Sequence, residues 1–163
     1  MDENILVRLF EHNNWANEQI IQVCAGLSDE QLDAEPQSAT MGSLRKTLTH
    51  LVAAQRGYLA LLTLPPEARA WTPLALSELQ ESARRSGEGL LALARDISPL
   101  PVQVQSTDGY LIAPWVVMVQ VINHATEHRE QINNMLSALG VTPPSLDGWS
   151  YGEVTDALVL ITE

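Results

Sequence analysis

The sequence has few of the features expected of a secreted or membrane protein. Cys24 is the single cysteine among 163 residues, so no disulfide can form within the chain. No apolar run approaches the ~20 residues that are needed to span a bilayer. The start, Met1-Asp2-Glu3-Asn4, is acidic, whereas a secretory signal begins with basic residues. These absences predict a cytoplasmic protein with no membrane partner.

Basic side chains are also scarce. Nine Lys and Arg residues stand against twenty Asp and Glu residues, which gives a formal net charge of −11. A charge of this sign repels the phosphate backbone of nucleic acids at every approach. The pair Arg84-Arg85 is a local exception, and on a helix such a pair is typical of solvated surface. The sequence therefore predicts no nucleic-acid partner.

The apolar residues, in contrast, are numerous and regularly spaced. They make up 45% of the chain, which is enough for one core, and predict a single domain over residues 1–163. Their 3.6-residue period predicts four long helices, at residues 2–25, 43–64, 77–97 and 114–139. Asp2 is the expected N-cap of the first helix. Ser77, followed three residues later by Gln80, predicts a capping box at the start of the third.

Shorter elements are predicted between and after these helices. Ser28 and Gln31 form a capping-box pattern for a brief helical turn. The period changes to two at residues 102–105, and the turn signal Asp108-Gly109 precedes a second short apolar run at residues 110–112, which indicates a β-hairpin. A last helical segment is expected at residues 153–161. The predicted fold is therefore all-α, a four-helix bundle with a small hairpin between its third and fourth helices.

The histidines carry the strongest chemical signal. His124 and His128 are four residues apart in the fourth predicted helix, so their rings share one face and can reach one metal ion at about 2.0–2.1 Å. The alternative is two hydrogen-bonded core histidines. A third imidazole could come from an earlier helix, either from His50, beside the small Ala54 in the second helix, or from His12 in the first.

Other polar and aromatic residues support either a site or ordinary packing. Glu127 and Gln131 lie within one helical turn of a histidine and are candidates for orienting a ligand or contacting a substrate, or they are plain surface residues. Asn17 is a candidate buried amide that bridges to the fourth helix. Four large residues are expected in the core: Trp15, Trp115, Met118 and Met135.

Three motifs resemble those of the DinB family, also called DinB/YfiT-like proteins, a group of candidate metalloenzymes. They are Asn14-Trp15-Ala16-Asn17-Glu18, Ser43-Leu44-Arg45-Lys46-Thr47-Leu48-Thr49-His50-Leu51 and Asn123-His124-Ala125-Thr126-Glu127-His128-Arg129-Glu130-Gln131-Ile132. The resemblance covers nearly the whole chain. It implies a four-helix bundle whose His50, His124 and His128 bind a divalent metal, with zinc or nickel favoured over iron or manganese. The chain departs from the family pattern at Glu130, where a small residue is usual.

The resemblance also implies a function. Three protein nitrogens leave one coordination position for water or substrate, as in catalytic metal sites. Relatives resemble enzymes that use a low-molecular-weight thiol such as bacillithiol or mycothiol, so we expect a metal-dependent thiol S-transferase-like enzyme or a hydrolase acting on a small-molecule substrate. The alternative is a non-catalytic metal-binding stress-response protein. A homodimer is expected, and the DNA-damage-inducible part of the family's name describes regulation.

Overall fold

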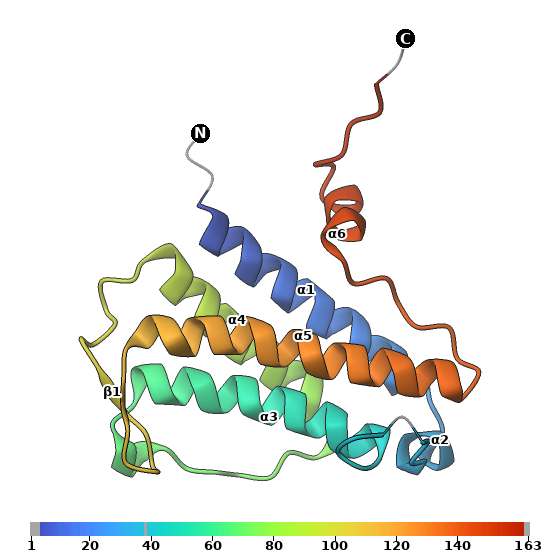
Figure 1. Cartoon of the computed structure of the whole chain (residues 1–163), viewed down its shortest axis with the longest axis horizontal. Coiled ribbons are helices and arrows are strands. Elements are labelled where there is room, and N and C mark those ends of the chain that lie inside the picture. Colours follow the sequence, from blue (N-terminus) through green and yellow to red (C-terminus); the bar gives the residue numbers. More distant parts are fainter. Residues whose placement is uncertain (1–3, 38, 162–163) are drawn as a thin grey trace.

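The computed structural model describes residues 4–37 and 39–161. Four long helices form the body of the molecule (Figure 1): α1 (Ile5–Ala25), α3 (Leu44–Thr63), α4 (Leu79–Arg95) and α5 (Pro114–Ala138). Helices α1 and α3 each pack against both α4 and α5. Every long helix thus has two neighbours, which confirms the predicted four-helix bundle.

Short elements connect the long helices. Helix α2 (Asp29–Asp33) begins at Ser28 with the predicted capping box: the Gln31 amide donates to Ser28 Oγ at 3.2 Å, and the Ser28 amide donates to Gln31 Oε1 at 3.0 Å. The predicted hairpin is also present, as β1 (Val104–Gln105) antiparallel to β2 (Leu111–Ile112). Two 3-10 turns, η1 (Pro66–Ala68) and η2 (Leu76–Glu78), lie in the long connection before α4.

Two helix starts differ from the predicted ones. The expected cap Asp2 lies outside the described residues, and the Oδ1 atom of Asn4 caps α1 by accepting from the Leu6 amide at 3.0 Å. Helix α4 begins at Leu79, after η2, and not at the Ser77 box. There the Glu78 carboxylate accepts from the Ala75 amide at 2.8 Å, so the capping contact lies two residues earlier than the sequence pattern indicated.

The last helical segment was predicted too late in the chain. Helix α6 (Gly148–Val154) is capped by Asp147, whose Oδ1 accepts from the Ser150 amide at 2.8 Å. Residue Asp156 then takes a left-handed φ of 55°, which ends the helix. The apolar run at residues 157–161, which suggested a helix, contains no helical residue. The Asp147 cap fixes where this helix begins, because a helix of seven residues buries too little apolar surface for packing to fix its position.

The core is apolar along most of its length. One buried cluster contains Leu48 and Ile132, and a second contains Phe10 and Val117. Met118 and Met135 are buried as predicted. Trp115 is not: its side chain is 68% exposed, because it lies on the wall of an open groove and not beneath a neighbouring helix. Within the described residues, no helix combines the length and apolar character needed to cross a membrane.

Candidate metal centre

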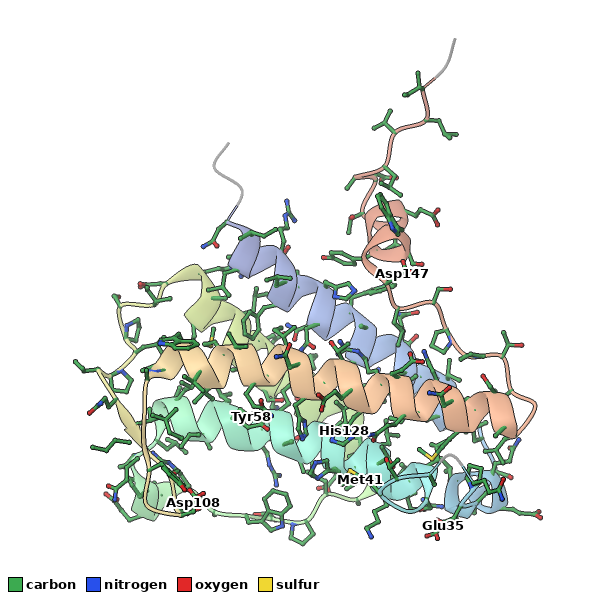
Figure 2. All side chains as sticks on the ribbon, viewed as in Figure 1. Glu35, Met41, Tyr58, Asp108, His128 and Asp147 are labelled. Atoms are coloured by element: carbon green, nitrogen blue, oxygen red, sulfur yellow. The ribbon has the colours of Figure 1, made fainter. Side chains whose placement is uncertain are left out.

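The three predicted ligands meet between two adjacent helices. His50 lies on α3, and His124 and His128 lie one turn apart on α5. Helices α3 and α5 run alongside each other, with His128 and Tyr58 on their facing sides (Figure 2). One ring nitrogen from each histidine lies within 4.8 Å of the others. The sequence spacing on α5 and the packing of α3 therefore place three imidazoles around one point.

Two of the three distances between these nitrogens match the needs of a metal ion. The Nε2 atom of His124 lies 3.2 Å from Nε2 of His50 and 3.2 Å from Nε2 of His128. A tetrahedral ion with metal–nitrogen distances of about 2.0–2.1 Å would separate two ligand nitrogens by about 3.3–3.4 Å. Two edges of the cluster are thus within about 0.2 Å of tetrahedral spacing, and the donor set fits an ion that accepts imidazole nitrogens.

Burial keeps these imidazoles ready to coordinate. Burial, followed by the neighbouring charges of His128 and His50, lowers the pKa of His124 to about 4. Burial and His128 also lower the pKa of His50 from its usual 6.5. Since only a neutral imidazole offers a lone pair to a metal, both rings are in the coordinating form at neutral pH.

Gln131 fixes the orientation of one ligand. The Nδ1–H of His128 donates to Gln131 Oε1 at 2.8 Å, one turn further along α5. This bond selects the tautomer whose Nε2 lone pair faces the other two histidines. His128 is also the most buried of the three, with 6% of its surface exposed. The interpretation of Gln131 as a residue that orients a ligand is consistent with this contact.

Tyr58 adjoins the cluster and was not singled out from the sequence. Its ring meets the His124 ring edge-on, with 5.6 Å between centroids, and its hydroxyl oxygen lies 3.5 Å from Nε2 of Gln120 on α5. The sequence could have indicated Tyr58 through the spacing of His50, Ala54 and Tyr58, because residues four apart lie on one side of a helix. An aromatic residue at that spacing was indistinguishable from ordinary packing.

The remaining candidates lie apart from the three nitrogens. Glu127 is an exposed residue of α5. His12 is on α1, where its Nε2–H donates to the Leu146 carbonyl at 2.8 Å and its ring packs against Trp15 and Tyr151. His12 is therefore a structural residue that holds the C-terminal segment on α1 and not a member of the cluster.

Asn17 joins a buried polar network around Arg129, the residue that follows His128. The Arg129 Nη1 group donates to Asn13 Oδ1 at 2.7 Å and to Asn17 Oδ1 at 2.6 Å, while Nη2 donates to Thr126 Oγ1 at 3.1 Å. These neutral oxygens are its partners in the described part of the chain. Burial lowers the pKa of Arg129 to about 10. The predicted bridge from Asn17 to the fourth long helix is confirmed.

The same network continues to the other two helices. Asn17 Nδ2 donates to Gln55 Oε1 on α3 at 2.8 Å, and Gln55 Nε2 donates to Ser86 Oγ and to the Ala83 carbonyl on α4, both at 2.9 Å. One chain of buried hydrogen bonds thus links α1, α3, α4 and α5. Such satisfied networks fix the relative positions of the elements that they connect.

Taken together, the fold and the three histidines define a helical-bundle protein with a candidate metal centre between α3 and α5. Comparison with known proteins places it more narrowly. The model of the DinB family matches residues 1–161, and the chain belongs to this family.

One curated protein and one solved structure are similar to this chain. Protein DinB of Bacillus subtilis (strain 168) is 25% identical over 158 residues, which cover 88% of this chain and 91% of the relative. A crystal structure from Exiguobacterium sibiricum 255-15, described as a candidate member of the DinB family, superposes with a TM-score of 0.67 at 16% identity. It covers 86% of this chain and 93% of the other. The family and the fold are thereby established, and the three histidines could hold a metal ion.

Proposed function

We propose that this protein is a metal-dependent enzyme that activates a thiol or a water molecule as a nucleophile. The observation that carries the proposal is the spacing of three imidazole nitrogens, which supplies three ligands and leaves the fourth position of a tetrahedral ion for an exchangeable group. A closed structural site would have a fourth protein ligand. In the described residues, the group of potential ligand atoms consists of these three histidines.

The charge of the ligand set favours an anionic fourth ligand. All three ligands are neutral, so a divalent ion would keep its full charge, and when bound it would lower the pKa of a coordinated thiol or water toward neutrality. The chain's own groups would hold this arrangement. Gln131 keeps the His128 Nδ1–H engaged, and Tyr58 and Gln120 present a hydroxyl and an amide beside His124 that can orient a substrate.

We infer thiol S-transfer from a low-molecular-weight thiol to a small electrophile as the reaction class, with hydrolysis as the second form of the same nucleophile chemistry. The protein would orient the thiol and, with the metal bound, would lower its pKa, so that the thiol could act as a nucleophile toward the electrophile. Zinc or nickel suits three imidazoles, and iron or manganese is also compatible with nitrogen ligands. We propose Gln131, which contacts His128, and the exposed Glu127, which precedes His128 on α5, as the first positions to test for substrate contacts.

Elemental analysis of tag-free protein tests the metal. We expect about one divalent ion per chain in the wild type and loss of the ion in His50→Ala and in His124→Ala, because each removes one of three ligands. His12→Ala is the matched control and should keep the ion, since His12 is bonded to Leu146. A wild type that binds neither zinc nor nickel after reconstitution would overturn the proposal.

Product analysis tests the chemistry. The metal-loaded wild type is incubated with a thiol and a chromogenic electrophile, and the conjugate is compared with that from the metal-free protein and from His50→Ala. Conjugation that needs both the metal and His50 supports the enzyme. Stoichiometric metal binding without conjugation or hydrolysis, for several thiols and esters, would instead favour the non-catalytic metal-binding protein.

A further inference from the structure

Arg129 is a buried cation without an ionic partner. It is 4% exposed, and its three hydrogen bonds go to neutral oxygens of Asn13, Asn17 and Thr126. Within residues 4–37 and 39–161, no carboxylate forms an ion pair with it. Buried charges in proteins are normally paired, because an unpaired one keeps the full cost of its lost hydration. The position of Arg129 therefore suits an anionic group supplied by a ligand.

The guanidinium of Arg129 still has donors to offer. It carries five N–H groups, of which Nη1 uses two and Nη2 uses one in the hydrogen bonds to neighbouring side chains. The Nε–H and the second Nη2–H have no acceptor in the described part of the chain. Donors on two nitrogens of one guanidinium can bind both oxygens of a single carboxylate, which is the strongest pairing available to arginine.

A pocket beside Arg129 gives a ligand access to it. The pocket has a volume of about 390 Å³ and lies between α1, α5 and the segment that leads into α6. This volume is typical of a site for a small molecule. Four of its lining residues, at helical steps of three and four, form one side of α5: Thr126, Arg129, Glu130 and Asn133. His50, His124 and His128 do not occur among the described residues that line it, so the pocket is separate from the candidate metal centre.

Two hydrogen bonds hold the third wall of this pocket in place. On α1, His12 Nε2–H donates to the Leu146 carbonyl at 2.8 Å, and on α5, Asn133 Nδ2 donates to the Pro144 carbonyl at 3.4 Å. Figure 2 shows Asp147, which follows this wall, at the start of α6. The segment is thus tied to both helices, and the pocket is formed before a ligand binds, as is usual for small-molecule sites.

The charges that line the pocket differ between its buried and its exposed parts. Arg129 is buried, whereas the carboxylates of Glu130 and Asp147 belong to exposed residues. The hydrogen bond from the Ser150 amide holds the pKa of Asp147 below its usual range, so this carboxylate is ionised at neutral pH. Asn133 adds a buried Oδ1 that has no hydrogen-bond partner in the described residues. These negative groups repel a simple anion and attract a ligand that also carries a cationic group.

We propose that this pocket binds a free α-amino acid, with its carboxylate at Arg129 and its ammonium group at Glu130 and Asp147. An α-amino acid carries both charges and is neutral overall, so it satisfies the buried guanidinium without adding net negative charge beside the two carboxylates. The proposal does not depend on the metal chemistry, since none of the three histidine ligands lines the pocket in the described part of the chain.

Isothermal titration calorimetry with the standard L-amino acids tests the proposal. We expect saturable binding of at least one of them. The amino acid that binds most tightly should bind at least tenfold more tightly than the carboxylic acid that lacks only its amino group, and than the amine that lacks only its carboxylate, because each analogue loses one charged contact. No binding of any amino acid at millimolar concentrations would refute the proposal. Equal affinity for the carboxylic acid would reduce the pocket to a simple anion site and would also contradict it.

Substitutions test which charges recognise the ligand. Glu130→Gln removes one exposed carboxylate and should weaken amino-acid binding about three- to tenfold. Glu153→Gln makes the same change at an exposed residue of α6 outside the pocket, and as the matched control it should bind like the wild type. Arg129→Lys should bind at least tenfold more weakly, since lysine has no paired donors. Because Arg129 also joins α5 to α1, the decision rests on Glu130→Gln, with circular dichroism as the check on folding. Equal affinities of Glu130→Gln and the wild type would count against the proposal.

Amino acids also coordinate metal ions, so the position of the ligand needs its own test. His50→Ala should bind the amino acid as tightly as the wild type, because no described residue of α3 lines the pocket. In NMR spectra of the 15N-labelled protein, the largest shift changes are expected at the backbone amides of Ser145 and Leu146. Loss of binding in His50→Ala, or shift changes centred on Tyr58 and His50, would place the ligand at the metal centre and would refute the proposal.

Discussion

Removing the side chain of Gln131 should weaken metal binding although Gln131 is not a ligand. In Gln131→Ala, the His128 Nδ1–H loses the acceptor that lies 2.8 Å away. The ring can then rotate or change tautomer, and part of the population turns its Nε2 lone pair away from His50 and His124. Loss of such an orienting bond typically reduces metal affinity 10–100-fold, which is about 1.4–2.7 kcal/mol. We expect an effect in this range because His128 is buried and has few other partners for Nδ1.

Competition with a chromophoric zinc chelator measures this change. Gln131→Glu is the conservative control, because its carboxylate still accepts from Nδ1–H, and its affinity should equal or exceed that of the wild type. Glu127→Ala removes an exposed carboxylate at a similar distance along α5 and should change the affinity less than threefold. If Gln131→Ala and Glu127→Ala have the same small effect, the hydrogen bond does not orient the ligand and the reasoning is wrong.

Three further results are expected from unfolding experiments in urea. The metal-free protein should lose on the order of 1 kcal/mol of stability as the pH falls from about 6.5 toward 4. In this range His124 of the unfolded chain, with its ordinary pKa, binds a proton, whereas the partly exposed His124 of the folded chain, with a pKa of about 4, does not. Asn17→Ala should destabilise the protein by about 2–3 kcal/mol, since buried Arg129 loses a charge-assisted bond of 2.6 Å, whereas exposed Asn134→Ala should change stability by less than about 0.5 kcal/mol. Gly57→Ala, in the interior of α3 with no atom within 4 Å of the added Cβ, should stabilise the protein by about 0.5–1 kcal/mol.

The predictable parts of this structure are those that depend on residues close in sequence. The spacing of His124 and His128 sufficed to place both rings on one face of α5, and the Ser28–Gln31 pattern formed the capping box that it indicated. The same holds for the hairpin around Asp108-Gly109, whose turn places Gly109 at a φ of 95°. His50 required one further step, the packing of α3 on α5, which the family resemblance supplied.

The unpredicted parts depend on contacts between distant residues. Arg129 was passed over because a basic residue on a helix is usually solvated, and its burial arises from asparagines more than a hundred positions earlier. A glycine inside a helix usually weakens it, yet at Gly87 of α4 an added Cβ would lie 2.5 Å from Asn14 Oδ1, so the glycine permits α1 to approach. Trp115 was expected in the core because its position fits the apolar period of α5, yet it is exposed. The sequence does not show which apolar residues of a helix face lack a neighbouring helix to cover them.

The network around Arg129 also bears on whether a bound metal would be catalytic or structural. The histidines join only α3 and α5, whereas Asn17, Gln55, Ser86 and Arg129 join all four long helices without a metal. The bundle therefore has its own means of holding α3 against α5, and the metal-free protein should keep native circular dichroism and a single cooperative unfolding transition.

Metal would still raise the melting temperature, because any ligand of the folded state does so, and the size of that rise does not separate the two roles. The state of the metal-free protein does separate them. If the chain is unfolded or lacks fixed packing without metal, as small zinc-dependent domains do, the metal is structural. A folded metal-free chain means that the three imidazoles are arranged in advance, as a site that exchanges its fourth ligand requires.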